Sequence, residues 1–185
     1  MDQEEIKLQK MVKILAIDDE ETVAKLYQSL ITEMGYTVVI AKTGKDAVAR
    51  IDKESFDLVL LDLKLPDVHG CELLGQIKEK IGNAPVIIVT AHPTLESSID
   101  AIRTGGVYDY IIKPFKADAL KVVIRRAVEK ALLTSENKRL LKRLEISNQV
   151  LGERVEQLEK VASVALSYEG KISELKEQIR QLEKR

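Results

Sequence analysis

Apolar and polar positions follow two alternating patterns over the first two thirds of the chain. One pattern is a short, β-branched and nearly continuous apolar run bounded by Gly, Asp or Pro. Such runs are typical of strands that are buried on both faces. They occur at Val12–Ile17, Thr37–Ala41, Leu58–Leu61, Val86–Val89 and Tyr110–Ile112.

Amphipathic stretches of helical length separate these runs. The first ends at Gly35, a residue type suited to the end of a helix, and the fourth ends at Gly105 and Gly106. The predicted helices are Thr22–Met34, Gly44–Asp52, Cys71–Ile81 and Thr94–Thr104, with a fifth that begins near Asp118. Strands that alternate with helices predict a doubly wound α/β fold, a parallel sheet with helices on both faces.

The fifth predicted helix has no feature that would end it. No proline follows Asp118, and apolar positions recur every seven residues. One set of these positions is Leu144, Leu151, Leu158, Ala165, Ile172 and Ile179. Its partner set is Leu141, Asn148 and Val155 in the first half, then Val161, Tyr168, Leu175 and Leu182 in the second. Sustained heptads predict a coiled coil of two or more helices.

The partner set changes sides between Leu158 and Tyr168. A three-residue phase change, a stammer, explains this shift and would overwind the coil locally. Gly152 and Gly170 weaken the helix, each by about 1 kcal/mol relative to alanine. Asn148 at a core position favours a parallel, in-register homodimer. A single helix packed on its own domain is the alternative, although this helix would extend about 100 Å, far beyond one small domain.

The charge balance also divides the chain. Its 185 residues include 29 Lys+Arg and 30 Asp+Glu, a formal net charge of −1. Residues 1–117 hold 14 basic and 19 acidic residues, a net −5, whereas residues 118–185 hold 15 and 11, a net +4. At 45% hydrophobic and 32% charged residues, the composition excludes a disordered chain. We predict a folded domain over 1–128 and a coiled-coil signalling helix or linker over 129–185.

The sequence favours a cytoplasmic location. Its one cysteine, Cys71, has no partner for an internal disulfide and is expected to be a buried structural thiol. The segment Met1–Glu5 is acidic where a signal peptide is basic. No apolar run approaches the roughly 18 residues that a membrane span requires.

Acidic residues stand at the ends of two predicted strands. Asp18 and Asp19 follow the first strand, and Asp62 follows the third. If these strands are neighbours, the carboxylates meet at the sheet edge where open α/β folds bind ligands. Like charges about 4 Å apart repel by about 4 kcal/mol at an effective dielectric near 20, so the cluster needs a proton or a cation. An oxygen-only site suits Mg²⁺.

Two further strand ends add a hydroxyl and an amine. Thr90 follows the fourth strand and Lys113 the fifth. A carboxylate can accept a phosphoryl group as an acyl phosphate, and Mg²⁺ with a lysine can stabilise the group in transfer. The structural alternative is that Asp18 or Asp19 merely caps the following helix.

Four segments in this order and spacing resemble the receiver domain of bacterial two-component response regulators, over residues 12–128. They are Ile14–Asp19, Leu58–Gly70, Val86–Ala91 and Tyr110–Phe115. The resemblance implies a flavodoxin-like fold with strand order 2-1-3-4-5 and a Mg²⁺ cofactor. It also implies that a sensor histidine kinase or phosphotransfer protein donates the phosphoryl group.

The resemblance makes Asp62 the phosphoacceptor. Thr90 and Lys113 would then hold the phosphoryl oxygens. Thr90 and Tyr110 would form the switch, with Tyr110 turning inward as Thr90 moves toward the phosphate. In this family the bond between Lys113 and Pro114 is often cis.

The resemblance also implies the metal ligands. Asp19, Asp62 and the backbone carbonyl of Lys64 would bind Mg²⁺ directly, and Asp18 mainly through water. Lys64 and His92 occupy positions that tune the acyl-phosphate lifetime in this family, although both are also ordinary surface positions.

Other functions fit the sequence less well. A haloacid-dehalogenase-type phosphatase needs a second Asp two residues after the first, where Glu20 follows Asp18 here. Direct DNA binding is not expected, because the charges of the last helix are mixed and no block of five or six basic residues occurs. A receiver fold that acts only as a phosphorylation-independent dimerisation or scaffold module stays as the alternative.

The expected protein is a signalling domain whose only chemistry is Mg²⁺-dependent self-phosphorylation and autodephosphorylation. It would dimerise through residues 129–185 and pass the switch along its last helix. The output stays open. Residues 136–141 resemble the linker that precedes an ATPase, cyclase or kinase module in longer regulators, while a stand-alone regulator would bind its partner through the coil.

Overall fold

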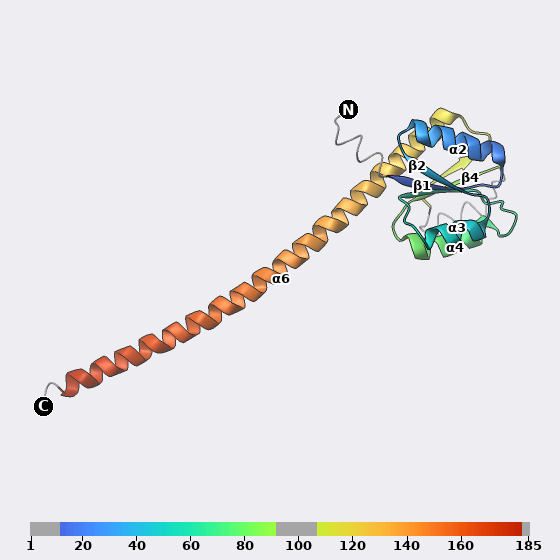
Figure 1. The fold of residues 1–185 in the computed structure, drawn as a ribbon. Helices are drawn as coiled ribbons and strands as arrows, with labels where there is room; N and C mark the ends of the chain where they lie inside the picture. The colour runs from blue at the N-terminus through green and yellow to red at the C-terminus, as the bar shows by residue number, and fades with distance from the viewer. Residues whose placement is uncertain (1–11, 92–106, 183–185) are drawn as a thin grey trace. The chain divides into compact units, whose positions relative to one another are not determined.

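Five parallel strands form one sheet in the part of the chain that the structure, a computed structural model, describes, residues 12–91 and 107–182. The strands are β1 (Lys13–Ile17), β2 (Thr37–Ala41), β3 (Leu58–Leu61), β4 (Val86–Thr90) and β5 (Asp109–Ile112). Their spatial order is β2-β1-β3-β4-β5, and every pairing is parallel. The predicted flavodoxin-like topology is confirmed (Figure 1).

The strand register brings two acidic residues to one place. Ile17 of β1 pairs with Leu61 of β3 at the carboxyl ends of both strands. The N–H of Asp62 then donates to the carbonyl oxygen of Ile17 at 2.9 Å. Asp18 and Asp62 therefore leave the sheet as neighbours, as the sequence predicted.

Helices cover both faces of the sheet. They are α2 (Glu21–Glu33), α3 (Gly44–Ile51), α4 (Gly70–Ile81) and α6 (Ala117–Leu182). One core cluster joins α2 and the start of α6 to Ile14 and Ala16, and the other joins α3 and α4 to Leu15 and Ile17. Figure 1 shows α2 on one face and α3 with α4 on the other. Successive residues of β1 thus bury opposite faces, which explains the continuous apolar run.

Helix ends lie close to their predicted positions. Helix α2 begins and ends one residue before the predicted Thr22–Met34. Gly35 follows it with φ of 84°, a left-handed conformation that glycine adopts without strain. The predicted helix Thr94–Thr104 and its glycine stop lie outside the described residues.

Helix α6 begins in the core of the domain. Leu120, Ile124, Ala127 and Val128 are buried, and Leu132 packs against the same cluster. The chain divides into two compact units between Ser135 and Glu136. The domain boundary after residue 128 stays a prediction, although the core contacts continue to Leu132.

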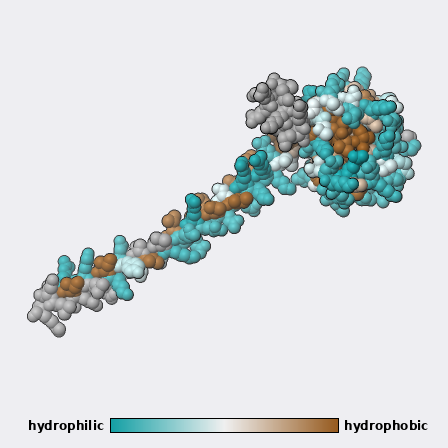
Figure 2. Space-filling view, in the orientation of Figure 1, coloured by the Kyte–Doolittle hydropathy of each residue, from teal (hydrophilic) through white to brown (hydrophobic). Residues whose placement is uncertain are grey.

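The second unit is helical throughout its described residues. Helix α6 passes through Gly152 and Gly170 without a break. Figure 2 shows apolar side chains recurring along it between polar ones. The heptad positions with described side chains are exposed, namely Leu141, Leu144, Asn148, Leu151, Val155, Leu158, Tyr168, Ile172 and Ile179. The side chains of Val161, Ala165, Leu175 and Leu182 lie outside the description. The coiled coil stays a prediction.

Among the residues with a described structure, no helix combines the length and the apolar character that crossing a bilayer requires.

Candidate functional site

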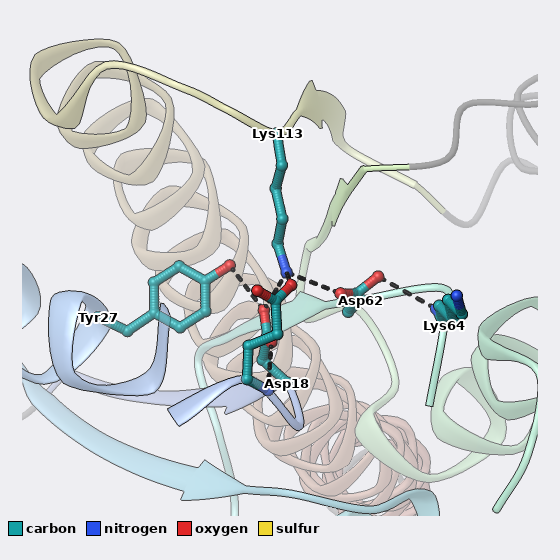
Figure 3. Close-up of polar contacts among 6 residues, drawn as sticks. Asp18, Tyr27, Asp62, Lys64 and Lys113 are labelled. Carbon is teal, nitrogen blue, oxygen red and sulfur yellow. Dashed lines mark hydrogen bonds and ion pairs between the residues drawn. The ribbon is translucent and has the colours of Figure 1, made fainter. Parts of the chain in front are cut away.

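The ammonium group of Lys113 lies at the centre of the site, just after β5. Its Nζ donates to Asp18 Oδ2 and to Asp62 Oδ2, each at 2.7 Å, and to Glu20 Oε1 at 3.0 Å. The side chains of Lys113, Asp18 and Asp62 are 8%, 0% and 5% exposed. Figure 3 shows the lysine reaching from β5 to the two aspartates. The residues that directly follow β1, β3 and β5 therefore meet at one edge of the sheet, as the sequence predicted.

The charges of this cluster depend on one another. Burial alone would lower the pKa of Lys113, but its hydrogen bonds with Asp18, Asp62 and Glu20 hold that pKa above its usual value. Burial raises the pKa of Asp18, and the hydrogen bond and charge of Lys113 offset part of this rise. Lys113 therefore stays protonated at neutral pH and neutralises part of the cluster's negative charge.

Asp18 is held in place from two sides. The N–H of Glu20 donates to its Oδ1 at 3.1 Å, and the hydroxyl of Tyr27 donates to its Oδ2 at 3.4 Å. Tyr27 is buried in α2, and its ring lies parallel to that of Phe115 with centroids 6.4 Å apart. Burial and the charge of Asp18 raise the pKa of Tyr27, so its hydroxyl stays a donor. Sequence reasoning missed Tyr27, although a tyrosine on the apolar face of a helix often has a buried polar partner.

Hydrogen bonds within residues 62–70 hold the loop that follows Asp62. Asp62 Oδ1 accepts a hydrogen bond from the N–H of Lys64 at 3.1 Å. Lys64 and His69 form an antiparallel bridge, and the N–H of Gly70 donates to the carbonyl of Leu63 at 2.8 Å. A Cβ on Gly70 would lie 2.5 Å from Leu63 Cα and 2.7 Å from Asp62 O. Only glycine therefore fits at the first residue of α4, which lies against the backbone of Asp62 and Leu63.

A cavity of about 280 Å³ opens beside Asp62. Its lining comprises Asp19, Glu20, Asp62, Lys64, Leu65, Pro66 and Ala91. Oxygens of Asp18, Glu20 and Asp62 lie within 4.8 Å of one another, a grouping that can hold a metal ion. Because all of these donors are oxygens, the site fits Mg²⁺. The sequence pattern did not indicate Glu20 as a site residue. Direct binding by Asp19 and by the Lys64 carbonyl stays a prediction.

The remaining predicted residues surround this edge of the sheet. Thr90 is fully buried at the end of β4, and its carbonyl accepts the N–H of Lys113 at 2.8 Å. The hydroxyl of Tyr110 is buried and has no hydrogen-bond partner among the described residues. The bond between Lys113 and Pro114 is cis. His92 lies outside the described part of the chain.

A family model, the response regulator receiver domain, matches residues 14–125. The chain belongs to this family. Its acids, hydroxyl and lysine lie at four strand ends in the order expected of a receiver domain. The resemblance found in the sequence is confirmed.

Curated relatives agree with this assignment. The regulatory protein LuxO of Vibrio cholerae is 39% identical over 115 residues, which are 62% of this chain and 25% of LuxO. The transcriptional regulatory protein ZraR of Escherichia coli is 33% identical over 117 residues, 63% of this chain and 26% of ZraR. The chain thus spans about a quarter of the length of these relatives.

Solved structures show the same receiver fold. A CheY-like response regulator receiver domain protein from Methanospirillum hungatei has a TM-score of 0.65 and 30% identity, covering 68% of this chain and 99% of that one. NtrX from Brucella abortus has a TM-score of 0.64 and 35% identity, covering 70% of this chain and 30% of that one.

Proposed function

We propose that this chain is a response regulator of a two-component phosphorelay. Asp62 accepts a phosphoryl group from the phosphohistidine of a sensor histidine kinase or a phosphotransfer protein. The observation that carries the proposal is the position of Asp62. Its carboxylate is hydrogen-bonded to Lys113 at 2.7 Å and to the N–H of Lys64 at 3.1 Å, and it lines an open cavity.

The transfer forms one bond and breaks another. A carboxylate oxygen of Asp62 attacks the phosphorus atom, and the bond from phosphorus to the donor's histidine nitrogen breaks. The electron pair of that bond returns to the imidazole, leaving an acyl phosphate on Asp62. Lys113 offsets the negative charge of the group in transfer, and the Thr90 hydroxyl donates to a phosphoryl oxygen.

The carboxylates provide the metal site of this proposal. Asp19, Asp62 and the carbonyl of Lys64 would hold Mg²⁺ directly, and Asp18 would act mainly through water. When bound, Mg²⁺ would supply positive charge that offsets the negative charge of the group in transfer. The hydrogen bonds from Tyr27 and from the Glu20 N–H keep Asp18 in a fixed orientation toward this site.

Phosphorylation is tested by intact-mass analysis of the whole chain. After incubation with Mg²⁺ and acetyl phosphate, we expect the wild type to gain one phosphoryl group and Asp62→Asn to gain none. The matched control Asp57→Asn changes a carboxylate that bonds the Lys13 N–H at 2.8 Å, before β3 begins, and should be labelled like the wild type. An unlabelled wild type, beside a known receiver that is labelled, would favour the phosphorylation-independent dimerisation or scaffold module.

We also propose that residues 129–185 form a dimeric coiled coil. Its support is the row of exposed apolar side chains at heptad spacing in α6, which a lone helix leaves in water. Phosphorylation of Asp62 would shift Thr90, Tyr110 and the start of α6. Since α6 is continuous, that shift can alter the register or crossing of the coil and so reach an output module or a partner. Phosphorylation can shift the coil between two arrangements only by as much as it stabilises one arrangement more than the other.

Dimerisation is tested by sedimentation equilibrium of the full chain. We expect a dimer for the wild type and a monomer for Leu151→Asp, because a charge in the seam would be desolvated without a partner. Ile146→Asp is the matched control, since Ile146 is similarly exposed, at 55% against 62% for Leu151, but lies five residues away on the opposite side of the helix. A wild-type monomer, or equal loss of dimer in both variants, would contradict the predicted seam.

A further inference from the structure

The hydrogen-bonding capacity of Lys113 is fully used in this structure. A lysine ammonium has three N–H groups to donate. Its Nζ contacts one carboxylate oxygen each of Asp18, Asp62 and Glu20, at 2.7, 2.7 and 3.0 Å. Under the proposed function, Lys113 must also donate to a phosphoryl oxygen on Asp62. One of the three existing hydrogen bonds therefore has to break.

The three carboxylates differ in how easily they can give up their hydrogen bond to Lys113. Asp18 has a side chain that is 0% exposed and is bonded to Tyr27 as well. Phosphorylation at Oδ1 of Asp62, which accepts from Lys64 and not from Lys113, would leave Oδ2 as a carbonyl oxygen that still accepts from the lysine. Glu20 has a side chain that is 55% exposed, and its contact is the longest of the three. Its carboxylate can return to water, so its bond is the least costly to break.

Two hydrogen bonds hold the main chain of Glu20, whereas its exposed side chain can rotate. Its N–H donates to Asp18 at 3.1 Å, and its carbonyl accepts the N–H of Ala24 in the first turn of α2 at 2.9 Å. A side-chain rotation is therefore enough to release Lys113, with no movement of β1 or α2.

We propose that the Glu20 carboxylate is a temporary hydrogen-bond partner of Lys113 that a phosphoryl oxygen displaces. It occupies the N–H that the phosphoryl oxygen requires, and it keeps the lysine over Asp62 until the phosphoryl group arrives. Because this contact is lost on phosphorylation, Glu20 lowers the affinity of the site for the phosphoryl group. This inference rests on the proposed function and adds a positioning residue to it.

The test uses beryllofluoride, a phosphoryl mimic, in calorimetric titrations of the full chain with saturating Mg²⁺. Glu20→Ala removes both the contact and the charge. Glu20→Asp keeps the charge but shortens the side chain, so the contact with Lys113 is lost. From the small worth of an exposed ion pair, we expect both variants to bind beryllofluoride about two- to fivefold more tightly than the wild type.

Glu21→Ala is the matched control, because Glu21 is the next residue and pairs with Lys42 and Lys25 outside the site. It should bind beryllofluoride like the wild type. If Glu20→Asp behaves like the wild type while Glu20→Ala binds more tightly, the negative charge at position 20 alone lowers the affinity, and the proposal of a displaceable contact is wrong. Weaker binding in either Glu20 variant would also overturn it. Absence of binding in every protein, wild type included, would instead overturn the proposed function.

Discussion

Lys113→Met is expected to destabilise the receiver domain by about 3–5 kcal/mol in EDTA, the usual effect of removing one partner from a buried ion pair. The substitution leaves Asp18 and Asp62, which are 0% and 5% exposed, without their cation. It should also abolish most phosphoryl uptake. Stability is measured by urea denaturation of the full chain with EDTA and with Mg²⁺. Mg²⁺ should restore part of the loss, because it binds the folded carboxylates and not the unfolded chain.

The stability of Lys113→Met should also depend on pH in a defined direction. Burial already raises the folded-state pKa of Asp18 above the unfolded value, and loss of Lys113 removes the groups that offset this rise. The folded state then binds a proton more tightly than the unfolded state, so stability increases as pH falls through the folded pKa toward the unfolded one. A variant equally stable at pH 5 and pH 8 in EDTA would contradict this account.

Lys121→Met is the matched control for this substitution. Lys121 also pairs with one carboxylate, that of Glu33 at 2.8 Å, but the Glu33 side chain is 66% exposed. We expect a loss below about 1 kcal/mol, as for other exposed pairs. Equal losses of stability in both lysine variants would show that burial of Asp18 and Asp62 adds nothing to the cost of removing their cation.

Gly70→Ala is expected to destabilise the domain by about 1–3 kcal/mol, the range for overpacking a filled site. Its Cβ would lie 2.5 Å from Leu63 Cα and 2.7 Å from Asp62 O, both backbone atoms that no side-chain rotation can move. The main chain beside Asp62 must therefore shift. Phosphorylation by acetyl phosphate should slow as a result. Urea denaturation and intact-mass time courses measure the two effects.

Gly75→Ala in the same helix is the control for Gly70→Ala. A Cβ on Gly75 meets nothing within 4 Å. Alanine there should stabilise α4 by about 0.5–1 kcal/mol, because it loses less backbone entropy than glycine. Opposite signs for the two substitutions would show that close approach to the Asp62 loop, and not helix propensity, requires glycine at position 70. Two substitutions of the same sign would contradict this.

The sequence by itself determined the fold of the first domain. Continuous apolar runs such as Leu58–Leu61 predict strands buried on both faces, and the structure buries all four residues. Gly35 predicts the end of α2 and adopts the expected left-handed conformation. These features depend on local pattern and backbone preference, which a single sequence contains. The order of acids, hydroxyl and lysine along the chain also indicated Asp18, Asp62, Thr90 and Lys113 as site residues.

Only the tertiary structure decided which side chains surround Lys113. Its partners Asp18, Glu20 and Asp62 lie 95, 93 and 51 residues away in sequence. No local pattern distinguishes Glu20, which bonds the lysine, from Asp19, although both line the cavity. That distinction follows from the direction in which each side chain leaves the turn between β1 and α2. The hydrogen bond from Tyr27 likewise exists only because α2 packs on the sheet, with Tyr27 in the same core cluster as Ile14 and Ala16 of β1. Local sequence determines strands and helices, whereas the packing of these elements decides which of their polar groups meet.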